Sequence, residues 1–454
     1  MRLQSPWTPR LADGRGLAHE KLVAALAEDI AEGVLAAGAR LPAHRELAYQ
    51  LGLGLGTVTK AYAVLERRGL VQAVRGRGMF VARLAPRPMA QIDLSINVPP
   101  QVLSDRLLAA TLGRLSQRLG AAAFGAYAPA AGLPQHRTAM ARWLAGQGLD
   151  YPADGVLLCH GAQHALWVAF AATCPPDGVI LTEAITYPGA IQITRASGRR
   201  LVGLAMDGEG ILPEALEEAL ARLAKARPRV LYATPTLQNP TTATMSVGRR
   251  HDIVRLCRRH DVTIVEDDVY AALADPGLPR LAALAPERTL HVGGLSKTLS
   301  PGLRIGSLAL PPGWIAPALA ALQASSTMAP PLTGLIMEEW LADGTAASVA
   351  ASIRAEAARR AVLAETLLPE GSLRAVTCFH VWLPMPLLAA ERLARQAAAA
   401  GVLVMPPDAP LTDPAATSGG IRLSLGGPSI AALKQGLEAI AACLGGAAAN
   451  GGIV

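Results

Sequence analysis

The chain has 454 residues, which is too long for one compact core and predicts two or three domains. Apolar residues make up 51% and charged residues 17%, a balance that excludes a disordered chain. The N-terminus lacks the apolar stretch of a secretory signal, and apolar runs elsewhere are interrupted before they reach membrane-spanning length. The five cysteines form no CxxC pair. These features predict a cytoplasmic protein without a disulfide framework, a metal site or a membrane segment.

The net charge of +7 is concentrated near the N-terminus. Residues 1–83 contain 12 Lys and Arg against 7 Asp and Glu, a net +5, and the remainder contains 30 against 28, a net +2. An excess of positive charge in one segment is typical of a part that binds a polyanion, and it is also the composition of a basic, solvated face.

The first eighty residues have the pattern of three helices followed by a hairpin. The first helix, which reaches Gly38, has apolar residues at a spacing of four: Leu22, Leu26, Ile30 and Val34. A short helix over 44–51, a glycine turn over 52–56 and a third helix over 57–69 follow, the third with Val58, Tyr62 and Leu65 on one face. The runs "LVQAV" and "MFVA" flank "RGRG", as in a β-hairpin. Together they predict an α/β winged helix-turn-helix whose third helix enters a DNA major groove.

Residues 41–82, "LPAHRELAYQLGLGLGTVTKAYAVLERRGLVQAVRGRGMFVA", resemble the DNA-binding domain of the GntR family. The resemblance implies a DNA-binding domain over residues 1–83. It also implies DNA contacts from six side chains, the last two on the wing: Arg45, Thr57, Thr59, Lys60, Arg75 and Arg77. Two departures stand out, because Gly54 and Leu55 replace the usual Ser-Arg before the third helix, and Ala43 replaces a capping Ser or Thr.

Residues 84–92 form a short, Pro-rich linker. After it, strand-like runs such as "GVLLC", "GVILT", "RVLYAT", "VTIVED", "TLHVGG" and "RIGSLAL" alternate with helical stretches. This alternation predicts an α/β domain with a mostly parallel sheet, whose ligands bind at the carboxyl ends of the strands. The last residues, 446–454, have the composition of a disordered tail.

Each motif near those strand ends has an ordinary structural interpretation when it is taken alone. Lys297, in "GGLSKTLSPGLRIG", is either a solvated turn lysine or a buried amine that forms a Schiff base with an aldehyde cofactor. Asn239 precedes a proline as in many turns, and Gly161 stands between a strand and a helix, where its following amides suit a phosphate.

Taken in order, "YAPAAGLPQHR", "GAQHAL", "TYPGA", "QNPTTA", "EDDVY" and "SKTLSPGLRIG" resemble the motifs of fold-type I, pyridoxal-phosphate-dependent aminotransferases. The resemblance covers residues 93–445. It implies a large part over 136–346 and a small part made of 93–115 with 347–445, and it implies pyridoxal 5'-phosphate as the cofactor.

The same resemblance implies the role of each matching residue. Lys297 would form the Schiff base, Asp267 would pair with the pyridine nitrogen, and Arg422 would bind the α-carboxylate of an amino acid. The other residues would contact the ring or the phosphate: Tyr187, Asn239 and Tyr270 at the ring, and Gly161, Ala162, Gln163, Ser296 and Arg304 at the phosphate, with Tyr127 reaching it from the neighbouring subunit of a homodimer. Gly294 and His160 depart from the family's usual phosphate-binding residues.

A GntR-like domain joined to an aminotransferase-like domain resembles the MocR subgroup of bacterial transcription regulators. The resemblance implies a cytoplasmic, homodimeric regulator that binds operator DNA and responds to an amino acid, an amine or the cofactor itself. The alternative is a working aminotransferase with a vestigial DNA-binding domain. A regulator would show slow transamination, a half-reaction or none.

Overall fold

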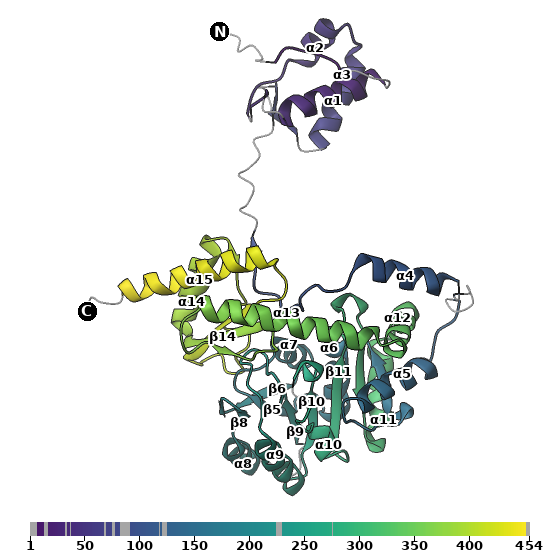
Figure 1. Ribbon diagram of the computed structural model, residues 1–454, viewed down its shortest axis with the longest axis vertical. Helices are drawn as coiled ribbons and strands as arrows, with labels where there is room; N and C mark the ends of the chain where they lie inside the picture. The colour runs from purple at the N-terminus through teal and green to yellow at the C-terminus, as the bar shows by residue number, and fades with distance from the viewer. Residues whose placement is uncertain are drawn as a thin grey trace. The chain divides into compact units, whose positions relative to one another are not determined.

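The computed structural model describes residues 7–12, 17–31, 34–36, 38–67, 70–74, 78–81, 91–117, 119, 125–223, 229–274 and 276–450. The chain divides into two compact units, residues 1–90 and 91–454 (Figure 1). Within the described residues, none of the helices has the length and apolar character needed to cross a lipid bilayer.

The N-terminal unit contains the three helices and the hairpin that the sequence predicts. They are α1 (Ala18–Ala31), α2 (His44–Leu51), α3 (Leu55–Arg67) and the antiparallel pair β1 (Val71–Val74) and β2 (Gly78–Val81). The predicted apolar faces are buried: Leu22 and Leu26 of α1 pack with Val58, Tyr62 and Leu65 of α3. This small core fixes α2 and α3 relative to each other, which is the arrangement of a helix-turn-helix.

Two boundaries in this unit differ from the sequence prediction. The first helix ends at Ala31, so Val34 lies outside it with 66% of its surface exposed. Gly33, a poor helix former, stands between them in the sequence. The third helix begins at Leu55 and not at Thr57. Ala43 is the N-cap of α2 and supplies no side-chain hydrogen bond, as its methyl group requires.

A seven-stranded sheet forms the centre of the larger unit. Its strands, in spatial order, are β4 (Val156–Cys159), β12 (Gly306–Ala309), β11 (Thr289–Gly294), β10 (Thr263–Asp267), β9 (Val230–Ala233), β5 (Val179–Glu183) and β6 (Arg200–Leu204). Each pairing from β11 to β6 is parallel, and β12 runs antiparallel to both of its neighbours. The predicted mostly parallel sheet is therefore confirmed, with β6 as an edge strand that the sequence analysis did not identify.

Helices cover this sheet because its strands are apolar on both faces. They are α5 (Pro134–Ala145), α6 (Ala162–Thr173), α7 (Pro188–Ala196), α8 (Pro213–Arg222), α9 (Val247–Arg259), α10 (Leu281–Leu284), α11 (Pro312–Ser325) and α12 (Pro331–Ala342). The core between α6 and the sheet contains an edge-to-face contact of Phe170 with Tyr232, at 5.5 Å between ring centroids. Short strands β7 (Met206–Asp207) and β8 (Gly210–Ile211) form a separate hairpin.

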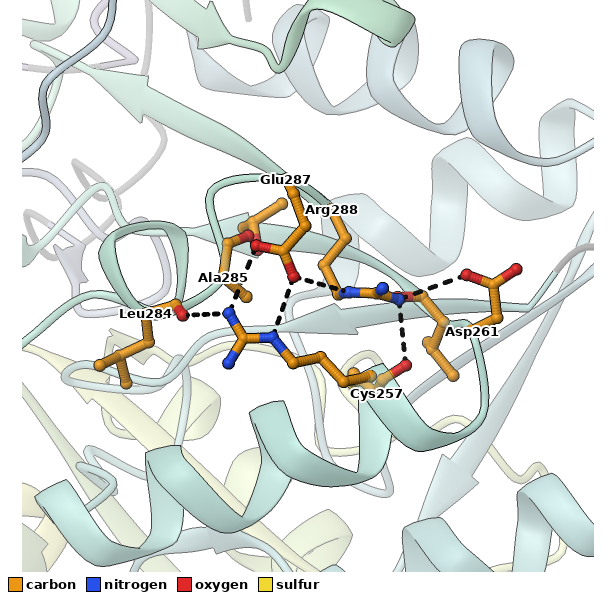
Figure 2. Close-up of polar contacts among 9 residues, drawn as sticks. Cys257, Asp261, Leu284, Ala285, Glu287 and Arg288 are labelled. Carbon is orange, nitrogen blue, oxygen red and sulfur yellow. Dashed lines mark hydrogen bonds and ion pairs between the residues drawn. The ribbon is translucent and has the colours of Figure 1, made fainter.

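Arginine side chains fasten the C-terminal end of α9 to the turn that precedes β11 (Figure 2). Arg288 donates from Nη1 to the carbonyl of Cys257, at 3.1 Å, and from Nε to Glu287, also at 3.1 Å. Hydrogen bonds from Arg258 hold the pKa of Glu287 down at about 2, so this carboxylate stays ionised. These contacts satisfy a carbonyl in the last turn of α9 and hold the start of β11, the strand that leads to Lys297.

The rest of the larger unit forms a smaller layer with sheets of its own. It contains the antiparallel sheet of β13 (Leu373–Arg374), β14 (His380–Pro386) and β16 (Ser418–Ser424), and the parallel pair β3 (Ile92–Asp93) and β15 (Val402–Leu403). The helices here are α13 (Thr345–Leu367), α14 (Leu387–Ala399) and α15 (Ile430–Asn450), which Figure 1 shows together. Helix α4 (Asp105–Ser116) packs instead against α12, where Arg114 pairs with Glu339 and Thr111 accepts a hydrogen bond from Trp340. Helix α15 continues to Asn450, four residues past the predicted start of the tail at 446, and residues 451–454 lie outside the described residues.

Candidate cofactor-binding site

Nine of the predicted site residues line one cavity at the carboxyl ends of the central strands. They are Ala162, Gln163, Tyr187, Asn239, Asp267, Tyr270, Ser296, Lys297 and Arg304, and Thr234, Val269 and Gly294 complete the lining. The parallel strands β5, β9, β10 and β11 all end at this edge of the sheet, so turns that are far apart in the sequence meet there. The arrangement is the one expected of a ligand site in an α/β fold.

Lys297 is held in the turn that follows β11. Its Nζ donates a hydrogen bond to the backbone carbonyl of Asn97. Burial, with a smaller contribution from the positive charge of Arg422, lowers the pKa of Lys297 to about 8. A lysine in a solvated turn would keep its ordinary pKa, so the solvated interpretation of this residue does not fit its surroundings.

Asp267, at the end of β10, has one oxygen paired and one free. The hydroxyl of Tyr232 donates to Oδ2 at 3.0 Å, whereas Oδ1 is buried and has no hydrogen-bond partner in the described parts of the chain. Burial raises the pKa of Asp267 to about 6, although the Tyr232 hydrogen bond lowers it. A buried carboxylate oxygen without a donor is costly, and a pyridinium N–H is the kind of donor that would satisfy it.

The phosphate end of the predicted site is built around Gly161 at the start of α6. Gly161 has φ +84°, and a Cβ at this position would lie 2.6 Å from Nη2 of Arg304. Arg304 donates to the carbonyl of His160 at 3.1 Å, and Oγ of Ser296 is buried without a partner among the described residues. An arginine, an unused hydroxyl and the first amides of a twelve-residue helix form a cradle that fits an anion.

We predict that Gly161→Ala weakens binding of pyridoxal 5'-phosphate about tenfold or more, because the new methyl group displaces Arg304 and strains the backbone. The measurement is a fluorescence or absorbance titration of cofactor-free protein. Gly148→Ala is the matched control, since Gly148 has φ +82° and open space around its Cβ position. An equal loss in both variants would contradict a specific role for Gly161.

The two departures from the family's phosphate residues have local structural accounts. A Cβ at Gly294 would lie 3.2 Å from Cβ of Ala162, so a side chain there would press on the first residue of α6. The ring of His160 lies near Ser326, with 2.6 Å between Nε2 and Oγ, and near the carbonyl of Met328. The His160 ring therefore contacts the segment after α11.

Tyr187 and Tyr270, which were predicted to contact the cofactor ring, come from different segments of the chain. The hydroxyl of Tyr187 is 3.5 Å from Oε1 of Gln163, and burial raises the Tyr187 pKa. Tyr270 is fully buried, and its oxygen accepts a hydrogen bond from Nδ2 of Asn97 at 2.7 Å. Burial also raises the pKa of Tyr270, so both phenols stay protonated and can donate to an acceptor in the cavity.

Arg422, on β16, contacts the site through Asn239. Its Nη1 donates to Oδ1 of Asn239 at 2.9 Å, and its Nη2 donates to the carbonyl of Ser95 at 2.5 Å. Its Nε is buried without a partner, and its hydrogen-bond partners among the described residues, Asn239 and Ser95, are not carboxylates. Burial lowers the Arg422 pKa. Within the described part of the chain, Arg422 therefore forms no structural ion pair that would account for a buried arginine at this position.

Asn97 and His380 are site residues that the sequence analysis missed. Nδ2 of Asn97 lies 3.1 Å from Nδ1 of His380, and Sγ of Cys378 lies at the same distance from that nitrogen. Asn97 stands in "LSINVPP" and His380 in "TCFHVW", neither of which has a motif that marks a site. Only contacts within the fold reveal them: Asn97 bonds Tyr270 and Lys297, and the ring centroid of His380 lies 5.8 Å from that of Tyr270.

Tyr127 is the predicted residue that the chain by itself does not bring to the site. Its side chain is 81% exposed, and it is not among the described residues that line the cavity. This position is compatible with the expectation that Tyr127 reaches the cofactor of a neighbouring subunit, which stays a prediction.

The predicted DNA-binding residues lie on α2 and on the first half of α3. Arg45, Thr59 and Lys60 are exposed and Thr57 is half-buried. The hydroxyl of Thr59 donates to the carbonyl of Leu55 at 2.9 Å, so in this rotamer its hydrogen is not free for a phosphate. Arg75 and Arg77 lie outside the described residues.

We predict that changing Gly54-Leu55 to Ser-Arg tightens DNA binding about threefold to tenfold. A serine at 54 has room, since its Cβ would lie 3.9 Å from the nearest atom, and it can cap α3. An arginine at exposed position 55 can add a phosphate contact. Filter binding at several salt concentrations measures both effects. Tyr49→Arg, which adds the same charge to exposed α2, is the control, and an equal gain there would mean a non-specific charge effect.

Comparisons with known proteins agree with this geometry. Residues 90–440 match the family "Aminotransferase class I and II", and residues 18–81 match "Bacterial regulatory proteins, gntR family". The chain is 29% identical over 314 residues to the uncharacterized HTH-type transcriptional regulator YdeF of Bacillus subtilis, covering 67% of each chain. It is 28% identical over 296 residues to the HTH-type pyridoxine biosynthesis transcriptional regulator PdxR of Corynebacterium glutamicum, covering 62% of this chain and 63% of that one.

A solved structure with a similar fold is LysN, the α-aminoadipate aminotransferase of Thermus thermophilus, in complex with N-(5'-phosphopyridoxyl)-L-leucine. Its TM-score is 0.72 at 27% identity, and the match covers 80% of this chain and 94% of LysN. The fold expected from the sequence is confirmed, and so is pyridoxal 5'-phosphate as the cofactor that accompanies it. The chain therefore belongs to the aminotransferase class I and II family, with a gntR-family domain joined to it, a combination that is consistent with the predicted MocR subgroup.

Proposed function

We propose that this protein is a pyridoxal-phosphate-dependent, DNA-binding transcription regulator whose larger unit senses an amino acid or an amine. The observation that carries the proposal is that one chain contains a gntR-family domain and a cavity in which Lys297, Asp267 and Arg304 converge. HTH-type regulators are also among its relatives. Because such a regulator acts on the chromosome, we also propose a cytoplasmic location.

Each residue of the cavity has a task that its surroundings favour. When bound, pyridoxal phosphate supplies an aldehyde that reacts with amines and a ring that accepts electrons. Asp267, with a pKa of about 6, is mostly ionised at pH 7, so its free oxygen can hold a protonated ring nitrogen. Tyr270 and Asn239 would hold the ring oxygen, and Tyr187 would lie against the ring.

Lys297 needs a neutral amine to attack an aldehyde. With a pKa of about 8, roughly one lysine in ten is neutral at pH 7, against about one in three thousand at the usual value near 10.5. The burial that lowers this pKa thus increases the reactive fraction by more than two orders of magnitude. The Lys297 amine would also lie close enough to the aldehyde carbon to accept or donate a proton there.

The phosphate would be held by Arg304, by Oγ of Ser296 and by the amides of Gly161, Ala162 and Gln163. Tyr127 of a second subunit would complete this end, so we propose a homodimer. Arg422, which has an unpartnered Nε in a buried position, would bind the carboxylate of an α-amino acid. Binding of the effector would then change the position or affinity of the DNA-binding units.

A second candidate function is an aminotransferase with a vestigial DNA-binding domain. Two observations favour it: Leu55 stands at the start of α3 where GntR-like domains usually have an arginine, and LysN, an aminotransferase, has a similar fold. The same cavity serves either role, because a sensor and an enzyme differ in how quickly product leaves and the site reopens.

The two functions are separated by measuring DNA binding and turnover on one preparation. Intergenic DNA beside the protein's own gene serves as the probe, with and without pyridoxal phosphate and a panel of amino acids and amines. We expect the full chain to bind with a steep salt dependence, a shift in affinity with one ligand, and slow or no transamination. Residues 93–454 alone should not bind. Fast transamination, together with a DNA affinity that does not change with any ligand, would favour the enzyme.

Arg45→Ala tests the proposed DNA surface within the full chain. If Arg45 contacts a phosphate, affinity falls and the slope of log K against log salt becomes shallower by about 0.9. Arg392→Ala, on α14 of the other unit, is the control for a general effect of lost positive charge. An unchanged slope in Arg45→Ala would mean that Arg45 does not contact the DNA backbone.

A further inference from the structure

Residues 95–97, between β3 and α4, are held by the two cations of the candidate site. Nζ of Lys297 donates to the backbone carbonyl of Asn97. Nη2 of Arg422 donates to the backbone carbonyl of Ser95 at 2.5 Å. Lys297 is the proposed attachment point of the cofactor, and Arg422 is the proposed binder of a ligand carboxylate. Both groups thus bond one tripeptide.

The side chain of Asn97 is a third anchor of this tripeptide. Its amide nitrogen donates to the oxygen of Tyr270 at 2.7 Å and lies 3.1 Å from Nδ1 of His380. Burial lowers the pKa of His380 to about 3, so the ring is neutral. Its Nε2 faces the carbonyl of Gln238 at 3.4 Å, which places the proton on Nε2 and leaves Nδ1 as an acceptor. Because Asn97 donates to the Tyr270 oxygen, the hydroxyl hydrogen of Tyr270 stays available for the cavity.

The remaining hydrogen bonds of Ser95 and Val98 are local, whereas Leu94, the residue before the tripeptide, bonds Leu403 through its amide at 2.8 Å and Ser424 through its carbonyl at 2.9 Å. The amide of Ser95 donates to Oδ1 of Asp93 at 2.8 Å, and the amide of Val98 donates to the carbonyl of Ile96 at 3.0 Å. The side chain of Ile96 is 62% exposed and adds little packing. Beyond the bonds of the flanking Leu94, the attachment of residues 95–97 to the larger unit therefore depends on Lys297, Arg422 and the Asn97 side chain.

We propose that residues 95–97 form a latch that is closed on the free Lys297 amine and opens when the cofactor is attached. The inference rests on the proposed function, in which Lys297 carries the cofactor. When the Lys297 nitrogen bonds the aldehyde carbon, the oxygen of the aldehyde leaves as water. The nitrogen then keeps at most one of its hydrogens. The Asn97 carbonyl then loses its donor and turns toward water, because a buried carbonyl without a partner is unfavourable.

The second anchor extends the same response to the effector. A carboxylate that binds Nε and Nη2 of Arg422 competes with the carbonyl of Ser95 for Nη2. Residues 92–93 form β3 directly before the latch, and residues 82–90 of the sequence connect this strand to the N-terminal unit. Opening of the latch thus frees residues 95–97 next to the segment through which the larger unit is joined to the DNA-binding unit, while β3 and Leu94 keep their bonds to β15 and β16.

Hydrogen exchange of the full-length protein tests the latch. Peptides covering residues 92–98 are compared without cofactor and after addition of pyridoxal phosphate, with attachment followed by absorbance and β9 peptides as an internal reference. We expect exchange at residues 95–98 of these peptides, which lie outside the β3–β15 pairing, to become about threefold faster or more after loading. Unchanged or slower exchange in protein that has attached the cofactor would overturn the latch.

Two variants show which anchor of residues 95–97 causes the change in hydrogen exchange. Lys297→Ala should exchange rapidly at 92–98 without cofactor and should not respond to pyridoxal phosphate. Asn97→Ala should exchange faster than wild type without cofactor and should still respond, because its backbone carbonyl remains. A response that persists in Lys297→Ala would also overturn the latch.

Failure of the latch and failure of the proposed function give different results. If the cofactor attaches and DNA binding responds to ligand while residues 92–98 do not change, the latch alone is wrong. If no cofactor attaches to Lys297, both proposals are wrong.

Discussion

Lys297→Ala is expected to abolish covalent attachment of pyridoxal phosphate. Wild-type protein treated with borohydride should carry one pyridoxyl group per chain at residue 297, and the variant should carry none. The physical reason is that burial lowers the Lys297 pKa to about 8 and so supplies a neutral amine next to the ring-binding residues. Mass spectrometry of peptides after reduction measures the result.

Lys434→Ala is the matched control for this experiment. Lys434 lies on α15, where it faces Glu438 at 3.8 Å, and it is not among the described residues that line the cavity. Its removal should leave attachment unchanged. Pyridoxyl found on another lysine in the wild type would show that Lys297 is not the attachment site.

Arg422→Ala is expected to remove the response to an α-amino acid while the cofactor stays bound. The bidentate bond between a guanidinium and a carboxylate is charge-assisted, so its loss should raise the half-maximal ligand concentration about a hundredfold. Bound cofactor should remain, because Lys297, Asp267 and Arg304 do not depend on Arg422 for their position on the central sheet. Absorbance titration with ligand and DNA binding with ligand both measure the response.

Arg422→Lys separates the charge from the geometry. Lysine keeps the positive charge at this position but has no planar fork with which to bind both carboxylate oxygens. We expect a response weaker than that of the wild type and stronger than that of Arg422→Ala. A full response in Arg422→Ala would mean that the effector has no α-carboxylate and is an amine.

Part of the site was predictable because short motifs and strand patterns carry local information. The apolar runs predicted β4, β5, β9, β10, β11 and β12, and the residues directly after them included Gly161, Tyr187 and Lys297. Parallel strands bring their carboxyl ends to one edge, so motif order alone indicated that these residues meet. The helical periodicity of the N-terminal unit likewise predicted the buried face of α3, whereas Val34 lies beyond the end of α1.

The amino-acid sequence by itself determined the two families, the cofactor and most of the cavity lining, because these depend on residue types at fixed local spacing. The tertiary structure alone decided which groups contact one another. Arg422 bonds Ser95 and Asn239, and Lys297 bonds Asn97, across sequence separations of 327, 183 and 200 residues. Contacts between residues so far apart in the sequence follow no periodicity and belong to no motif. Likewise, the free oxygen of Asp267 and the lowered pKa of Lys297 result from burial, which depends on atoms contributed by the whole fold.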